Sequence, residues 1–312
     1  MKNIKLYLLS GFLGAGKTTF LKQMLETLPN LKVGIVMNEF GKISIDGPIL
    51  EKPELEMVEL TRGSIFCSCL KLSFAEALIK MTDKDLEYVF VESSGLADPS
   101  NIGEILEAVA DYTIASYNYC GCINIIDAYH FMEQIDTIET IRRQVETADL
   151  IVINKADRVD ALTYQKIESQ LNEINPSAAC LKSKYFNIDF GFIGQKLIKS
   201  DVIRNELSHN TPENKPKTFS MQYDLGSVSH EKFTSFLELV APSAYRIKGF
   251  VQLSEVAFQF DVVGNLIDYV PSPNKFEKST IVFISKIGPQ LIKVVNDTWQ
   301  DLFSDVPMKL SN

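Results

Sequence analysis

The residues best suited to chemistry lie near the beginning of the chain, in the run Gly11-Phe12-Leu13-Gly14-Ala15-Gly16-Lys17-Thr18-Thr19. Its spacing, G-x-x-x-x-G-K-T, allows backbone N–H groups to approach a polyphosphate closely. The Lys17 ammonium can reach the β- and γ-phosphates, and the Thr18 hydroxyl can bind Mg2+. The residues predicted to bind a nucleoside triphosphate are Gly11, Gly14, Ala15, Gly16, Lys17, Thr18 and Thr19.

A second motif, Asn154-Lys155-Ala156-Asp157, follows an apolar run over residues 150–153. A carboxylate at Asp157 can accept hydrogen bonds from both the N1–H and the exocyclic amine of guanine, whereas adenine offers no such pair of donors. We therefore predict that GTP is the nucleotide and that Asn154, Lys155 and Asp157 contact its base. The alternative for this short motif is an ordinary solvated loop at a strand end.

Glu92 ends another apolar run, over residues 86–91. A carboxylate in such a place is costly unless it meets a cation or strong donors, and Mg2+ fits that need. The backbone N–H of Gly95 can contact the γ-phosphate, so that hydrolysis would release this loop and the loop that holds Glu39 and Asp46. The alternative for Glu92 is a cap on the helix that follows. The predicted catalytic residues are Lys17, Glu92 and Gly95, and the predicted Mg2+ ligands are Thr18, Asp46 and Glu92.

Cysteines suggest a second metal. Cys67 and Cys69 lie in a predicted loop, where two thiolates at i and i+2 can face one soft cation, with Glu39 and His130 as further ligands. His130 has the alternative of a hydrogen bond to a backbone carbonyl. Cys120 and Cys122 repeat the spacing on a predicted strand, where both would lie on one face. Whether that pair binds metal or packs in the core stays open.

Elements of alternating type must position these motifs. Apolar runs of strand length alternate with helical patterns from the start of the chain to about residue 208, with a last helix expected over 192–203. This order predicts an α/β domain, residues 1–208, whose mostly parallel sheet is covered by helices on both faces. Because the carboxyl ends of parallel strands share one edge, the motifs should meet there.

A second, smaller unit is expected after residue 208. Residues 209–217 are polar and contain Pro212 and Pro216, which indicates a linker. Residues 218–312 then predict an α+β domain, with a hairpin turn at Gly264-Asn265 and an apolar stripe on a helix that Ser229 caps. No catalytic constellation is found in it, so we expect a docking surface.

Composition excludes some classes of partner. The 312-residue chain has a net charge of −9 and a sequence pI near 5.0, which disfavours nucleic acid. No apolar run is long enough to span a bilayer, so no membrane association and a cytoplasmic location are expected. Five cysteines, an odd number in a long chain, indicate reduced thiols rather than a disulfide framework.

Taken together, these motifs resemble the CobW family of P-loop GTPases, whose members act as metal chaperones or insertases. The residues that carry the resemblance are 11–19 (GFLGAGKTT), 38–41 (NEFG) with Ile45-Asp46, 92–99 (ESSGLADP), 125–130 (IIDAYH), 143–149, 153–157 (INKAD), Asn175-Pro176 and 246–250 (RIKGF). The family's G-C-x-C-C motif is altered here, because Gly63-Ser64-Ile65-Phe66-Cys67 keeps one of its three thiols. Its histidine-rich tract is absent, since the chain has only three histidines.

The resemblance implies a GTP-hydrolysing metallochaperone that couples Mg-GTP binding and hydrolysis to delivery of a transition metal, zinc or cobalt. The expected partner is a client metalloenzyme or cofactor-dependent protein, bound through the C-terminal domain, and a homodimer stays open. The alternative is a GTP-driven regulatory or reactivation protein for a cofactor-dependent enzyme, carrying no metal itself. A small-molecule kinase is disfavoured by the guanine motif and by the lack of an obvious substrate lid.

Overall fold

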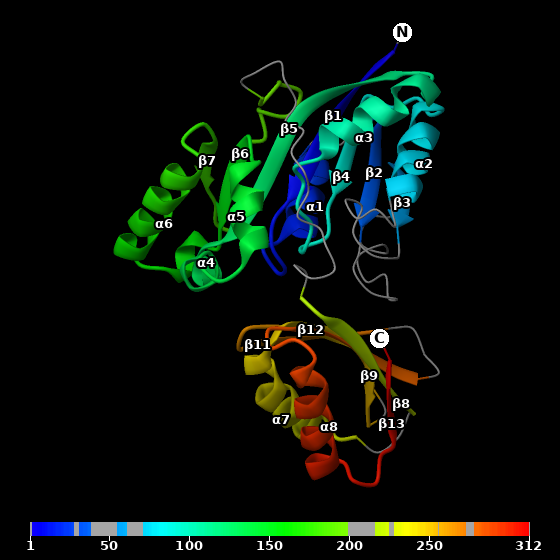
Figure 1. Cartoon of the computed structure of the whole chain (residues 1–312), viewed down its shortest axis with the longest axis vertical. Coiled ribbons are helices and arrows are strands. Elements are labelled where there is room, and N and C mark those ends of the chain that lie inside the picture. Colours follow the sequence, from blue (N-terminus) through cyan, green and yellow to red (C-terminus); the bar gives the residue numbers. More distant parts are fainter. Residues whose placement is uncertain are drawn as a thin grey trace. The chain divides into compact units, whose positions relative to one another are not determined.

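The computed structural model describes residues 2–27, 31–38, 55–60, 71–198, 216–224, 228–254, 256–272 and 278–311. The chain divides into two compact units, Met1–Asn214 and Lys215–Asn312 (Figure 1). Residues 209–215 of the expected linker lie outside the described residues, so the domain boundaries 1–208 and 218–312 stay predictions. Within the described residues, no helix is both long enough and apolar enough to cross a bilayer.

The first unit contains a seven-stranded sheet of order β3-β2-β4-β1-β5-β6-β7, and all of its strand pairs are parallel. Its strands are β1 (Asn3–Ser10), β2 (Val33–Asn38), β3 (Leu55–Leu60), β4 (Tyr88–Glu92), β5 (Ser116–Asp127), β6 (Leu150–Asn154) and β7 (Ala179–Lys182). The predicted α/β class is thereby confirmed.

Helices pack on both faces of this sheet (Figure 1). On one face Leu6 and Leu8 of β1 pack with α2 and α3, and on the other Tyr7 and Leu9 pack with Phe20 of α1. Burial on both faces explains why β1 reads as a continuous apolar run. The helices are α1 (Lys17–Thr27), α2 (Lys71–Thr82), α3 (Ile102–Val109), α4 (Ala128–Gln134), α5 (Glu139–Glu146) and α6 (Ala161–Ile174).

The helix expected over 192–203 is wrong for its described part, because residues 192–198 form turns and irregular chain. Gly194 has φ +96°, a conformation that ends a helix, and the N–H of Leu197 donates to the carbonyl of Cys120 at 2.7 Å. Phe192, Ile193 and Leu197 pack, partly buried, against the α1 side of the sheet, and Ile198 packs against the cluster on the other side. The spacing of these apolar residues resembles that of a helix because they are placed to pack against the core.

The second unit contains a six-stranded antiparallel sheet of order β11-β10-β9-β12-β8-β13. Its elements are β8 (Thr218–Asp224), α7 (His230–Val240), β9 (Ala244–Leu253), β10 (Val256–Val263), β11 (Leu266–Pro271), β12 (Lys278–Ser285), α8 (Gln290–Leu302) and β13 (Met308–Ser311). The Gly264-Asn265 hairpin is confirmed, because Val263 pairs with Leu266 and Gly264 has φ +60°. Strand β13 was not predicted.

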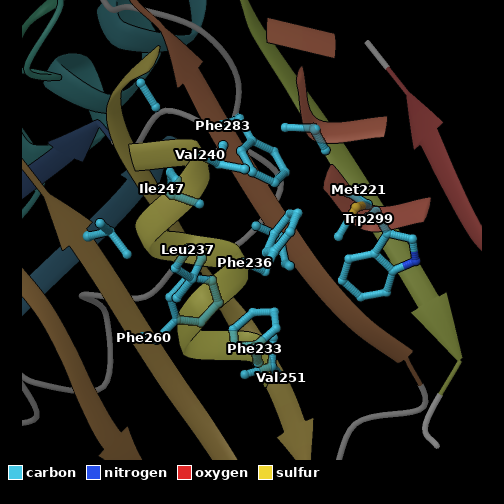
Figure 2. Packing of buried hydrophobic residues seen from close by; sticks show 14 of the residues in the cluster. Met221, Phe233, Phe236, Leu237, Val240, Ile247, Val251, Phe260, Phe283 and Trp299 are labelled. Carbon is cyan, nitrogen blue, oxygen red and sulfur yellow. The ribbon is translucent and has the colours of Figure 1, made fainter. Parts of the chain in front are cut away.

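An aromatic core holds the second unit together. Figure 2 shows Phe233 and Phe236 of α7 among the side chains of the sheet and of Trp299 on α8. The Phe236 and Trp299 rings meet edge to face, with centroids 5.2 Å apart, and such pairs add stabilisation to their burial. The helical stripe predicted after Ser229 is therefore the buried face of α7, and the Ser229 side chain caps the helix by accepting from the N–H of Lys232.

Candidate nucleotide-binding site

The loop between β1 and α1 has the backbone conformation that a phosphate cradle requires. Gly11, Gly14 and Gly16 have φ of +140°, +74° and +104°, which L side chains rarely adopt. A Cβ on Gly11 would lie 2.2 Å from the carbonyl oxygen of Ile125 on β5. The loop therefore lies directly against the sheet only because glycine is present.

Lys17 lies over this loop from the first turn of α1. Its Nζ donates to the carbonyl of Gly11 at 2.8 Å and lies 3.4 Å from that of Phe12, and the residue is 8% exposed. A buried ammonium needs such acceptors. The side chain is therefore held at the loop, within reach of a phosphate bound there.

Thr18 and Glu92 come together beside the loop. Leu9 of β1 pairs with Glu92 of β4 in the parallel register, which places the end of β4 next to the beginning of the loop. The Thr18 hydroxyl donates to Glu92 Oε1 at 2.9 Å, and Glu92 is buried. A hydroxyl and a carboxylate are the oxygen ligands that Mg2+ prefers, so these two residues fit the ion; Asp46 lies outside the described residues.

The segment that follows β4 packs against the phosphate loop. The Ser93 N–H and hydroxyl both donate to the carbonyl of Leu9, at 2.9 and 3.0 Å. A Cβ on Gly95 would lie 2.7 Å from the backbone nitrogen of Leu13. Glycine at position 95 therefore permits direct backbone contact between this segment and the loop.

The guanine motif reaches the same loop from β6. Asn154 Nδ2 donates to the carbonyl of Ala15 at 2.9 Å, and Lys155 Nζ donates to that of Gly14 at 3.0 Å. Lys155 adopts φ +56°, a turn that ends β6, and the exposed Asp157 lies in the short 3-10 helix Ala156–Arg158. The two motifs, far apart in sequence, thus share one rim of the sheet.

Asp127 lies in the 125–130 motif, but the sequence patterns assigned it no role in the site. It ends β5 and caps α4, since its Oδ1 accepts from the N–H of Tyr129 at 3.0 Å. Its Oδ2 accepts from Lys155 Nζ at 2.8 Å and lies 3.0 Å from His130 Nδ1. Burial raises the pKa of this carboxyl, but the hydrogen bond with His130 and the Lys155 ammonium outweigh it, so the pKa lies below its ordinary value.

His130 therefore has a carboxylate partner rather than the backbone carbonyl considered above. It lies on α4, near Lys155 of the guanine motif, and is buried. Its role as a transition-metal ligand stays a prediction. The signal that could have identified Asp127 is its place at the carboxyl end of a buried strand, next to the strand that carries Asn154.

Ser183 is a second residue that the motifs did not indicate. It follows β7, its N–H donates to the carbonyl of Ile153 at 2.9 Å, and its carbonyl accepts from the N–H of Ala156 at 3.3 Å. Among the described residues, the Ser183 hydroxyl and Asn154 Oδ1 are buried without a hydrogen-bond partner. Buried polar atoms are normally hydrogen-bonded, so these two atoms are candidates to bind a ligand. Strand β7 was not predicted, so its end loop was not considered.

Cysteine geometry overturns one expectation. Register between β1 and β5 shifts at Leu6 and Tyr7, and Gly121 has φ +134°. This bulge turns Cys120 toward the α1 side of the sheet and Cys122 toward the α2 side. The expectation that both lie on one face is wrong, and both thiols are buried in the core.

The remaining predicted metal ligands, Glu39, Cys67 and Cys69, lie outside the described residues. Within the part of the chain that the structure describes, no three histidine, cysteine or acidic side chains gather as a metal site. The transition-metal set therefore stays a prediction.

A glycine-rich loop between strand and helix, a threonine–carboxylate pair and a guanine motif on a parallel sheet define the class of P-loop nucleotide-binding proteins. Residues 5–182 match the nucleotide-binding domain described as CobW/HypB/UreG, and residues 218–294 match the cobalamin synthesis protein cobW C-terminal domain. The chain belongs to the CobW family, as its motifs indicated.

The chain is similar to proteins named as zinc chaperones and as a zinc-regulated GTPase. The zinc chaperone YjiA of Escherichia coli (strain K12) is 31% identical over 201 residues, which cover 62% of this chain and 61% of that protein. The zinc-regulated GTPase metalloprotein activator 1 of Dictyostelium discoideum is 27% identical over 215 residues, covering 56% and 44%. The matches thus span less than two thirds of either relative. A crystal structure of Zn(II)-bound YjiA GTPase from E. coli aligns with a TM-score of 0.48 at 22% identity, over 97% of this chain and 99% of that one.

Proposed function

We propose that the protein hydrolyses GTP and uses the reaction to control delivery of a transition metal to a client protein. The observation that carries the first part is the contact of Asn154 and Lys155 with the carbonyls of the phosphate loop. A guanine motif and a triphosphate cradle on one rim are what a GTPase needs. Relatives named as zinc chaperones and as a zinc-regulated GTPase support the second part.

In this proposal each residue of the rim has an electrostatic or positioning role, as is usual in phosphoryl transfer. Thr18 and Glu92 would hold Mg2+, which supplies charge neutralisation at the β- and γ-phosphates. Lys17 would neutralise the same phosphates, Gly95 would donate its N–H to the γ-phosphate, and Asp157 would select guanine. No general base is assigned.

The cargo would be zinc or cobalt, held by Cys67 and Cys69 with Glu39 and His130. We place this activity in the cytoplasm, where thiols stay reduced, and assign client docking to the second unit. The alternative remains a GTP-driven regulatory or reactivation protein in which these cysteines bind no metal. The double variant Cys67→Ser with Cys69→Ser discriminates, because unaltered metal stoichiometry would favour the alternative.

Phosphate release from GTP and ATP tests the nucleotide assignment. Lys17→Ala should lower GTP turnover about 100-fold or more, the usual effect of removing a charged transition-state contact, whereas Lys22→Ala, exposed on the same helix, should change it less than twofold. The proposal would be refuted if the unaltered chain hydrolysed ATP faster than GTP, or if the Lys17→Ala variant kept its GTP turnover.

Base recognition is tested at Asp157. Hydrogen bonds to a charged group contribute about 1.5–3 kcal/mol, so Asp157→Asn should weaken GTP binding about 10- to 100-fold and relax discrimination against xanthosine triphosphate. Asp136→Asn, at another exposed carboxylate, is the matched control. Unchanged guanine preference in Asp157→Asn would contradict the base assignment.

Metal coupling is tested by titrating zinc or cobalt with and without a non-hydrolysable GTP analogue. Thermodynamic linkage requires that, if the analogue tightens metal binding, the metal tightens analogue binding by the same factor. Identical metal affinities in both titrations would remove the chaperone hypothesis and leave the GTPase assignment intact.

A further inference from the structure

The segment after β4 is attached to helix α5 by one buried side chain. Gln144, 1% exposed, donates from Nε2 to the carbonyl of Ala97 at 2.8 Å and to that of Gly95 at 3.3 Å. An amide nitrogen has two N–H donors, and both are directed to this segment. Beside it, Arg143 Nε lies 3.7 Å from Asp98 Oδ2.

These contacts determine which way the Gly95 N–H is directed. The carbonyl of Ser94 accepts from the N–H of Ala97 at 3.0 Å. Because a trans peptide directs its C=O and N–H to opposite sides, the N–H of Gly95 is directed away from this turn. Gln144 holds the next carbonyl, that of Gly95, and also that of Ala97. The backbone on both sides of the Gly95 N–H is therefore fixed while Gly95 contacts Leu13 of the phosphate loop.

We propose that Gln144 is a positioning residue for γ-phosphate recognition. It touches no nucleotide in this proposal; it keeps the Gly95 N–H in the orientation that a γ-phosphate requires, and thereby sets how strongly the site prefers GTP to GDP. This inference rests on the proposed GTP binding. If Gln144 only filled space, an apolar side chain of the same length could replace it. Such a side chain could not donate the two hydrogen bonds to Gly95 and Ala97.

The test compares Gln144→Met and Gln144→Glu in the full chain, since both keep the length of the side chain and lose its donors. A hydrogen bond to a charged phosphate contributes about 1.5–3 kcal/mol, and 1.4 kcal/mol corresponds to a factor of ten. Affinity for a non-hydrolysable GTP analogue and kcat/KM with GTP should therefore fall about tenfold or more, while GDP affinity stays within twofold. Gln165→Met, exposed on α6, should leave all three values unchanged.

Equal losses of GTP-analogue and GDP affinity, or no loss of either, would overturn the positioning role. If neither variant folds, Gln144→Asn, which keeps the amide on a shorter side chain, replaces them with the same expected split between triphosphate and diphosphate. Failure of the proposed GTP binding is distinguishable, because the unaltered chain would then bind neither GTP nor GDP. Failure of this inference alone leaves guanine-nucleotide binding of the unaltered chain intact.

Discussion

Asp127→Asn removes one negative charge from the rim of the sheet and leaves the shape of the side chain almost unchanged. The amide oxygen of asparagine can still accept from the N–H of Tyr129 and cap α4. The Oδ2 that lies 2.8 Å from Lys155 Nζ and 3.0 Å from His130 Nδ1 is replaced by an amide NH2 group, which carries no charge and cannot accept from Lys155. The substitution therefore removes the charge and the hydrogen-bond acceptor that link β5 to the guanine motif.

The magnitude follows from burial. Removing one partner of a fully buried ion pair costs about 3–5 kcal/mol, but the Lys155 side chain is 25% exposed and keeps the carbonyl of Gly14 at 3.0 Å. We therefore expect the free energy of unfolding to fall by about 2 kcal/mol. For a domain of this size, that lowers Tm by roughly 4–8 °C.

The pH dependence gives a sharper test. The pKa of Asp127 is lowered in the folded protein from its ordinary value of 3.8, so its carboxylate stabilises the fold above that value, and this contribution is lost as pH falls through the folded pKa. The stability difference between the unaltered chain and Asp127→Asn should shrink as the pH falls below about 4.

Urea unfolding of both proteins at a series of pH values measures this difference. Asp111→Asn, at an exposed position, is the control and should cost less than about 0.5 kcal/mol. A stability difference that grows as the pH falls below about 4, or a loss at pH 7 no larger than that of the control, would refute the reasoning.

Two further predictions concern stability. Asn175→Ala should cost about 2 kcal/mol and lower Tm by roughly 4–8 °C in a thermal melt, because its amide donates to the carbonyl of Ala148, just after α5, at 2.9 Å, and a buried group left unpaired costs about 1–3 kcal/mol; a change no larger than that of exposed Asn172→Ala would contradict it. Gly11→Ala should lower the free energy of unfolding by about 3 kcal/mol or more, since a Cβ would lie 2.2 Å from the carbonyl oxygen of Ile125. Gly288→Ala, at φ +64° with nothing within 4 Å of the added Cβ, should lower it by only about 1 kcal/mol. Equal losses in the two variants would contradict the predicted clash and attribute the loss at Gly11 to backbone strain alone.

Local patterns predicted the larger part of the fold. Apolar runs of strand length with short polar ends identified β1, β4 and β6, because strands buried on both faces leave little room for polar residues. The Gly264-Asn265 turn was predicted correctly because its backbone conformation demands particular residues. The short strands β7 and β13 were missed, since four residues of half-exposed chain carry no periodic signal.

The site divides in the same way. The phosphate and guanine motifs were recognisable because each lies in one short run whose residue types the ligand chemistry demands. Asp127, Ser183 and Gln144 could not be assigned that way, because each has hydrogen-bond partners 27 or more residues away.

By itself, the sequence determined the class of nucleotide cradle, the α/β arrangement and the family, since each follows from residue type and spacing along a short stretch. Only the tertiary structure decided that Cys120 and Cys122 face opposite sides of the sheet, that His130 is paired with Asp127, and that α5 holds the segment carrying Gly95. Those outcomes depend on strand register, a single bulge and long-range hydrogen bonds. A bulge of one residue reverses the face of every side chain beyond it, and no local pattern records it.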